Sequence, residues 1–214
     1  MSRQPTDAFE PPLDPASLSD ASHTHDLDAA LHTTWALLSR GVADRRSPFH
    51  TPSVATVDAE GAPATRTVVL RAADPAQWML RFHTDRRSGK FADLSAVPRI
   101  ALLAYDVRGK IQVRATGLAK LHTDDEVAAA AWRNSRAQSR QCYTQEQAPG
   151  AELASPAEAR FLGGEPDENG RANFAAVVVD VHALEWLFLR ASGHRRARFE
   201  RTADGAITAR WLAP

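Results

Sequence analysis

Positively charged side chains on a strand and at the start of a helix are the residues of this sequence best placed to bind a ligand. Arg66 opens the strand-like segment 66–71, and the basic segment 84–91 follows it with Ser88 and Lys90 at a helix start. A helix N-terminus offers free N–H donors and a partial positive charge. Arg66, Ser88 and Lys90 are therefore a candidate phosphate site, although local spacing alone favours a charged, solvated turn.

Two further groups of polar residues could contact a ligand. Gln112 lies between apolar residues of a strand-like segment, where its amide can bind the edge of a heterocycle or face solvent. Arg195, Arg196 and Arg198 cluster near the C-terminus and can bind a ligand or line a charged edge strand. The sequence has no nucleophile elbow, no zinc-ligand set and no glycine-rich phosphate loop.

The hydrophobic pattern predicts the strands and helices that would position these residues. A helical face of apolar residues predicts a helix that ends near residue 40, with Gly41 as its stop. A second helix follows Lys90, and capping boxes at Thr123 and Ser155 predict two more helix starts. Strands are expected at residues 53–58, 64–72, 78–84, 100–107, 111–121, 174–181, 184–190, 195–201 and 207–212.

Short turns join most of these strands, which indicates an antiparallel arrangement. We predict a mainly β (β plus α) fold, an antiparallel β-barrel with peripheral helices. Residues 1–17 are rich in proline and acidic residues and are expected to form a flexible arm. No linker divides the strand-rich region, so residues 18–214 are predicted to form a single domain, with residues 163–170 as a loop.

Composition excludes several classes of function. The chain has 214 residues, with 26 Lys plus Arg against 26 Asp plus Glu, and this neutral balance argues against nucleic-acid binding. Cys142 is the single cysteine, so an internal disulfide or a multi-cysteine metal site is excluded. His23, His25 and His32 lack partners at metal-ligand spacing, and we expect solvated side chains and no metal. No apolar run approaches the roughly 18 residues of a membrane span, and the N-terminus does not resemble a signal sequence. These features predict a cytoplasmic protein without a membrane segment.

In the order of its motifs, the chain resembles the pyridoxamine 5′-phosphate oxidase family of FMN-binding split β-barrels, in a divergent oxidase-related branch. The resemblance runs from about residue 52 to residue 214. The motifs are Arg66-Thr67-Val68-Val69-Leu70-Arg71, Phe82-His83-Thr84, Ser88-Gly89-Lys90, Gln112-Val113-Arg114, His194-Arg195-Arg196-Ala197-Arg198-Phe199 and Trp211-Leu212-Ala213-Pro214. Each motif is weak alone, and their order makes the resemblance fairly specific.

The resemblance implies a homodimer that holds two FMN molecules at the subunit interface. It assigns the FMN phosphate to Arg66 and Lys90 with help from Ser88. The cofactor-binding set that it implies is Arg66, Thr67, Val68, Val69, His83, Thr84, Ser88, Lys90, Gln112 and Arg198. In that set Val68 and Val69 pass beneath the ring, His83 and Thr84 border the ribityl chain, and Gln112 and Arg198 lie at the ring. Arg71 and Arg195 are the substrate-binding candidates, and no catalytic residue is assigned.

The chain departs from the family at several of these positions. Gly89 replaces an arginine of the phosphate loop, and Arg71 replaces a lysine that helps to hold the substrate. FMN binding is therefore better supported than oxidation of pyridoxamine phosphate. The implied function is an FMN-dependent oxidoreductase that acts on a small substrate. The alternative is a cofactor-binding protein without turnover that carries FMN, haem or a deazaflavin, with His83 or His122 as candidate haem ligands.

Overall fold

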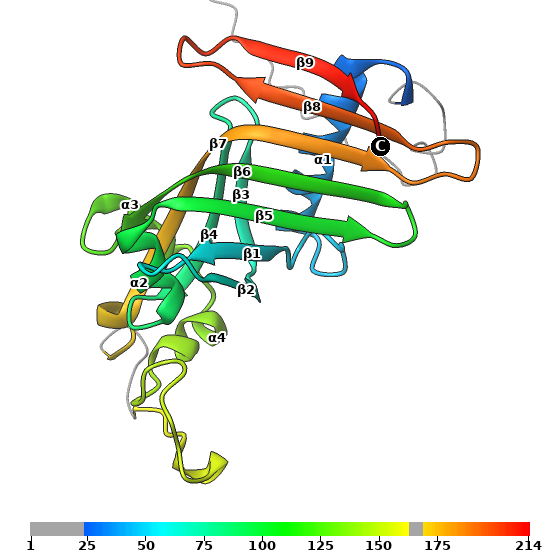
Figure 1. Ribbon diagram of the computed structural model, residues 1–214. Coiled ribbons are helices and arrows are strands. Elements are labelled where there is room, and N and C mark those ends of the chain that lie inside the picture. The colour runs from blue at the N-terminus through cyan, green and yellow to red at the C-terminus, as the bar shows by residue number, and fades with distance from the viewer. Residues whose placement is uncertain (1–23, 163–168) are drawn as a thin grey trace, which may run out of the picture.

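The computed structural model describes residues 24–162 and 169–214, and an antiparallel sheet dominates this part of the chain (Figure 1). The arm expected at residues 1–17, His23 and most of the loop expected at 163–170 lie outside the described residues. The elements are α1 (Leu27–Ala43), β1 (Ser53–Val57), β2 (Pro63–Thr67), β3 (Leu70–Asp74), β4 (Met79–Asp85), α2 (Gly89–Ala96), β5 (Arg99–Asp106), β6 (Ile111–His122), α3 (Glu126–Arg133), α4 (Ala137–Arg140), β7 (Phe174–Phe188), β8 (Arg195–Arg201) and β9 (Ile207–Leu212), with short 3-10 turns at Gln141–Tyr143, Pro156–Glu158 and Arg171–Asn173.

The described strands form one nine-stranded sheet. Its order is β2-β1-β5-β6-β7-β4-β3, and β8 and β9 extend it from the second half of β7. All of these pairs are antiparallel. Figure 1 shows α1 behind the sheet, while α2, α3 and α4 gather at one end of it. The predicted mainly β, antiparallel architecture with peripheral helices is confirmed.

The two faces of this sheet differ in burial. On one face, residues that lie directly opposite each other on five strands are all buried: Val54, Leu102, Ala115, Leu184 and Phe199. We call this the core face, because α1 and the larger hydrophobic cluster pack there. Side chains alternate along a strand, so the residues one or three positions away lie on the opposite, outer face. The face on which a candidate site residue lies therefore limits which other residues of the same chain can contact the same ligand.

The strand expected at residues 64–72 is instead two strands. β2 ends at Thr67 and β3 begins at Leu70, so the chain leaves β1 and pairs with β4. Between them the amide of Val68 donates to the carbonyl of Pro52, and the amide of Leu70 donates to that of His50. These hydrogen bonds to the segment before β1 provide partners for the backbone amides where the chain turns. Because the partners are distant in sequence, the local sequence did not predict the turn.

The two strands expected at residues 174–181 and 184–190 are instead one long strand, β7. Its register against β6 shifts by one residue, because Thr116 pairs with Ala183 and Gly117 with Val181. His182 is the extra residue of this bulge, which bends the strand without ending it. A Cβ at Gly117 would overlap the carbonyl oxygen of Asp180, so glycine permits the close approach of the two strands.

Three expected helix boundaries also need correction. Gly41 does not stop α1, which continues to Ala43; a Cβ at this buried glycine would overlap the carbonyl of Phe49, so its role is close packing. The cap of α3 is Asp125, not Thr123, and the Asp125 carboxylate accepts the amide of Ala128 at 3.0 Å. Ser155 makes no side-chain cap and precedes only a short 3-10 turn.

Candidate functional site

Arg66 lies on the core face of the edge strand β2, directly opposite Val54 of β1. Its guanidinium contacts the hydroxyl of Thr56 and lies 3.2 Å from the Asp93 carboxylate of α2. Thr56 in turn donates to Asp93 at 2.6 Å. A cation at this half-buried position needs an anionic partner, and Asp93 supplies one from the helix that carries Lys90.

Lys90 approaches the same place from the first turn of α2. Its ammonium donates to the Thr84 hydroxyl at 2.8 Å, and that hydroxyl lies 3.0 Å from the Ser88 hydroxyl. Burial, and then the positive charge of Arg66, lower the pKa of Lys90, although Asp85 and Asp93 partly oppose this. The structure therefore brings together four of the predicted residues, Arg66, Thr84, Ser88 and Lys90, which we call the Arg66–Lys90 cluster.

The backbone at the start of α2 is also suited to an anion. Ser88 is the N-cap of α2, but its side chain makes no capping hydrogen bond to the helix; it donates to the Asp85 carbonyl at 2.7 Å. Gly89 has open space where a side chain would begin. The first amides of the helix can thus face a ligand that the cations attract.

The other two basic residues of this loop are directed elsewhere. Arg87 forms a two-pronged ion pair with the buried Asp85, at 3.0 and 2.8 Å, and donates to the carbonyl of Glu146. Arg86 lies 3.5 Å from Asp124. Asp85 and Asp93 were not among the site residues expected from the sequence. Asp85 lies two residues before Arg87 and Asp93 three residues after Lys90, and this spacing was the pattern that could have identified them.

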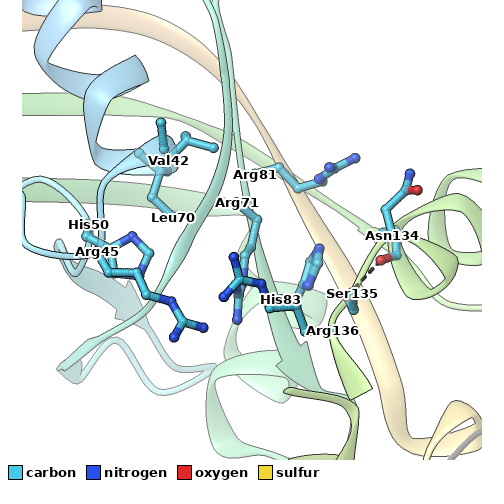
Figure 2. A pocket seen from close by; sticks show the side chains of 12 residues that line it. Val42, Arg45, His50, Leu70, Arg71, Arg81, His83, Asn134, Ser135 and Arg136 are labelled. Carbon is cyan, nitrogen blue, oxygen red and sulfur yellow. Dashed lines mark hydrogen bonds between the residues drawn. The ribbon is translucent and has the colours of Figure 1, made fainter. Parts of the chain in front are cut away.

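The segment from Arg66 to Arg71 links this cluster to a cavity. Val68 is buried and Val69 is half-buried at the bend between β2 and β3, whereas Thr67 is exposed. Beyond the bend, Arg71 lines a cavity of about 230 Å³ between the end of α1, strands β3 and β4, and the end of α3 (Figure 2). We call it the arginine cavity.

His83 lies in the arginine cavity and not in the Arg66–Lys90 cluster. It lies beside Phe174 in an edge-to-face contact, with ring centroids 4.8 Å apart. Burial, followed by the charges of Arg81 and Arg71, lowers the pKa of His83 to about 3, so the ring is neutral near pH 7. Its proposed contact with the ribityl chain stays a prediction.

Gln112 and Arg198 lie on the outer face of the sheet, opposite to Arg66. Gln112 is paired with Tyr105 and Leu187, three residues from the core-face Ala115. Arg198 is one residue from the core-face Phe199. Within one chain, the sheet therefore separates these two residues from the Arg66–Lys90 cluster.

The outer face carries an ion-pair network around Glu185. This carboxylate, 10 % exposed, lies 2.6 Å from Arg196, 2.7 Å from Arg198 and 3.4 Å from Arg114. Burial alone would raise the pKa of Glu185, but the hydrogen bond from Arg196 and the charge of Arg114 outweigh it, so the pKa lies below its ordinary value. Arg195 takes no part in this network; its guanidinium donates to the carbonyl of His194 at 3.0 Å.

Neither a metal-ligand cluster nor a membrane-spanning helix is found among the described residues. Within residues 24–162 and 169–214, no three His, Cys, Asp or Glu side chains gather as a metal site would require. No helix in that part of the chain is both long enough and apolar enough to cross a bilayer.

Comparison with known proteins places this geometry in context. The sequence model of the family described as pyridoxamine 5′-phosphate oxidase matches residues 43–188. The pyridoxine/pyridoxamine 5′-phosphate oxidase of Cupriavidus taiwanensis is 43 % identical to this chain over 74 residues, which is 35 % of this chain and 34 % of that protein. The enzyme of the same name from Burkholderia vietnamiensis is 38 % identical over 77 residues, which is 36 % of this chain and 35 % of that protein. The chain thus spans about a third of the length of these curated relatives.

Solved structures extend the likeness over nearly the whole chain. A pyridoxamine 5′-phosphate oxidase-related, FMN binding protein from Nostoc punctiforme has a TM-score of 0.69 and 22 % identity, and the match covers 87 % of this chain and 95 % of that one. PhzG from Burkholderia lata, in complex with tetrahydrophenazine-1-carboxylic acid, has a TM-score of 0.65 and 18 % identity over 97 % and 98 % of the two chains. These likenesses show the fold, and the expected split barrel is confirmed.

Proposed function

The chain belongs to the pyridoxamine 5′-phosphate oxidase family, and we propose that it is an FMN-dependent oxidoreductase acting on a small anionic substrate. One observation carries the proposal: Arg66 and Lys90, from separate elements, converge beside two hydroxyl groups and a helix N-terminus. This is the donor set that a phosphate monoester needs.

The electrostatics of the Arg66–Lys90 cluster support a phosphate there. Asp93 balances only one of the two cations, and the mutual repulsion helps to lower the pKa of Lys90. A dianionic phosphate would offset that repulsion and raise the pKa of Lys90 again. Thr84 accepts a hydrogen bond from the Lys90 ammonium and would hold it in place, and the Ser88 hydroxyl lies 3.0 Å from that of Thr84. Bound FMN would supply hydride acceptance, while the chain supplies binding and orientation.

A second copy of the chain is part of this proposal. Gln112 and Arg198 face away from the cluster, so one chain alone does not bring them to a flavin held by Arg66. Their face also exposes the large apolar side chains of Leu103, Tyr105 and Leu118, each about 40 % exposed. Such a patch favours association, and a homodimer would let the outer face of one copy meet the cluster of the other.

The substrate would lie next to Arg71, at the far end of the segment that begins with Arg66. The arginine cavity opens there and holds the neutral His83. Among residues 24–162 and 169–214, the Arg71 guanidinium makes one weak hydrogen bond, 3.5 Å to the Ser139 hydroxyl, which would leave it available to a ligand. Arg195 is the second candidate for substrate contact, because in the described part of the chain its guanidinium donates only to carbonyl groups of its own turn.

The ligand released from natively purified protein tests the proposal. We expect a yellow protein whose denatured filtrate has flavin absorbance and the mass of FMN. A Soret band would instead identify haem, and colourless protein that takes up no added FMN would refute the proposal. Rapid-mixing reduction by candidate amines then separates an oxidoreductase, whose flavin bleaches, from a carrier whose flavin stays oxidised. Size measurements with and without FMN test the homodimer.

A further inference from the structure

Two side chains outside the predicted cofactor-binding set hold the guanidinium group of Arg66. Thr56 of β1 and Asp93 of α2 both contact this group, and α2 packs against β1, so the helix brings Asp93 to the strand pair (Figure 1). Thr56 is 1 % exposed, and the side chain of Asp93 is 13 % exposed. The contacts to Arg66 are therefore largely shielded from solvent.

The three groups form a closed ring of hydrogen bonds. Nη1 of Arg66 donates to the Thr56 hydroxyl, which donates its single proton to Oδ2 of Asp93 at 2.6 Å. Nη2 of Arg66 donates to the same Oδ2 atom at 3.2 Å. Each of these hydrogen bonds restricts the other two, so Thr56 and Asp93 together determine where the guanidinium lies. We call this pair of residues the Thr56–Asp93 clamp.

The clamp leaves one edge of the guanidinium available. Of its five N–H groups, the two of Nη1 donate to Thr56 and to the carbonyl of Ala64 at 3.2 Å, and one of Nη2 donates to Asp93. Among residues 24–162 and 169–214, no acceptor meets the other N–H of Nη2 or that of Nε. The Thr56 and Asp93 oxygens lie side by side at the Nη1–Nη2 end, so the two remaining N–H groups lie along the Nε–Nη2 edge. Such an edge is a two-donor fork that can bind two oxygens of one phosphate.

Asp93 also relates this fork to Lys90. The two residues are three positions apart on α2 and therefore share one face of the helix. Burial, and then the charge of Arg66, lower the pKa of Lys90, while the charges of Asp85 and Asp93 raise it, so these groups are close enough to interact. The free edge of Arg66 and the Lys90 ammonium are therefore available to the same phosphate.

We propose that Thr56 and Asp93 are positioning residues for the FMN phosphate: the clamp holds the Nη1–Nη2 end of Arg66 and directs its Nε–Nη2 edge to the ligand. This inference rests on the proposed function, because FMN supplies the phosphate. A guanidinium that is fixed before the ligand arrives loses less side-chain entropy on binding, so the clamp strengthens the affinity. Asp93 contributes through geometry, since its negative charge by itself would repel a phosphate.

Thr56→Val tests the clamp, because valine has nearly the shape of threonine and lacks the hydroxyl group. We expect the Kd for FMN to rise about tenfold, while the Kd for riboflavin, which has no phosphate, stays unchanged. Thr56→Ser keeps a hydroxyl group and should bind FMN as the wild type does. Thr65→Val is the matched control, since Thr65 is exposed on the same strand as Arg66 and its side chain lies on the outer face.

Two variants of Asp93 separate its geometry from its charge. Asp93→Asn and Asp93→Ala remove the same negative charge, but only asparagine keeps an oxygen that can accept hydrogen bonds from Arg66 and Thr56. We expect FMN to bind about tenfold more weakly to Asp93→Ala than to Asp93→Asn. Equal affinities in the two variants would overturn the positioning role of Asp93.

A crystal structure of the wild-type protein with FMN tests the clamp without any substitution, should Thr56→Val fail to fold. We expect phosphate oxygens at Nε and Nη2 of Arg66, with the contacts to Thr56 and Asp93 retained. A phosphate that takes the place of Thr56 or Asp93 on the guanidinium would overturn the proposal.

Two titration results overturn the clamp and leave the proposed function intact. One is Thr56→Val protein that prefers FMN over riboflavin as strongly as the wild type does. The other is an equal loss of affinity for both flavins, which is the effect of a residue that only supports the fold. Wild-type protein that takes up no FMN is a different result, because it refutes the proposed function itself and the clamp with it.

Discussion

Replacement of Lys90 by methionine is the most direct test of the Arg66–Lys90 cluster, because methionine keeps most of the length of the unbranched side chain and removes its charge. The Lys90 ammonium donates one hydrogen bond in the described structure, to Thr84 at 2.8 Å, so its loss costs the fold little. A charge-assisted hydrogen bond to phosphate contributes about 1.5–3 kcal/mol. We therefore expect the Kd for FMN to rise roughly 10- to 150-fold.

Riboflavin is the matched ligand for this test, since it has the ring and the ribityl chain of FMN and lacks the phosphate. Titrations followed by quenching of flavin fluorescence should show that Lys90→Met weakens FMN binding and leaves riboflavin binding unchanged. Lys120→Met, which removes an exposed lysine from β6, is the control variant. An equal loss of affinity for both flavins, or no loss for FMN, would refute the assignment of the phosphate to Lys90.

The same interaction predicts a pH dependence. Burial and the charge of Arg66 lower the pKa of Lys90 in the free protein, and a bound phosphate would raise it again. FMN affinity should therefore fall as the pH rises through the lowered pKa, because binding then requires uptake of a proton. Lys90→Met should lack this component. Arg66 is a less clean target, because its loss also leaves the nearly buried Asp93 unpaired.

Three further predictions concern the parts of the fold that support the site. Gly41→Ala should lower the free energy of unfolding by about 1–3 kcal/mol, measured by urea denaturation, because the new methyl group overlaps Phe49; an unchanged midpoint would contradict the close packing. Glu185→Gln should cost about 1–2 kcal/mol at neutral pH and low salt, since the arginines around it are partly solvated. Because the folded pKa of Glu185 is lowered, the wild-type advantage should be complete above the ordinary glutamate pKa and disappear as the pH falls through the folded value; an advantage that persists in strong acid would contradict it. NMR should show His83 neutral from about pH 8 down to about pH 5, and a titration near pH 6.5 would refute its burial between Arg81 and Arg71.

The sequence by itself determined the element types and one local part of the site. Alternation of apolar residues identified the strands, and the motif around Ser88 and Lys90 correctly marked a helix start next to Thr84. Their contact with one another was predictable because all three lie within seven residues of chain, where strand, turn and helix geometry fix the spacing. That Arg66 would approach Ser88 and Lys90 was predicted from the family resemblance and from the expectation that its strand lies next to theirs.

Only the tertiary structure decided on which side of the sheet each candidate lies. Arg66 and Arg71 belong to different strands because the backbone turns at Val68 through hydrogen bonds to the segment before β1, a contact between residues distant in sequence. Gln112 and Arg198 share the outer face because pairing across β5, β6, β7 and β8 fixes their register, and a slip of one residue would reverse it. The arginine cavity likewise exists because four segments meet in space, and no local pattern encodes that meeting.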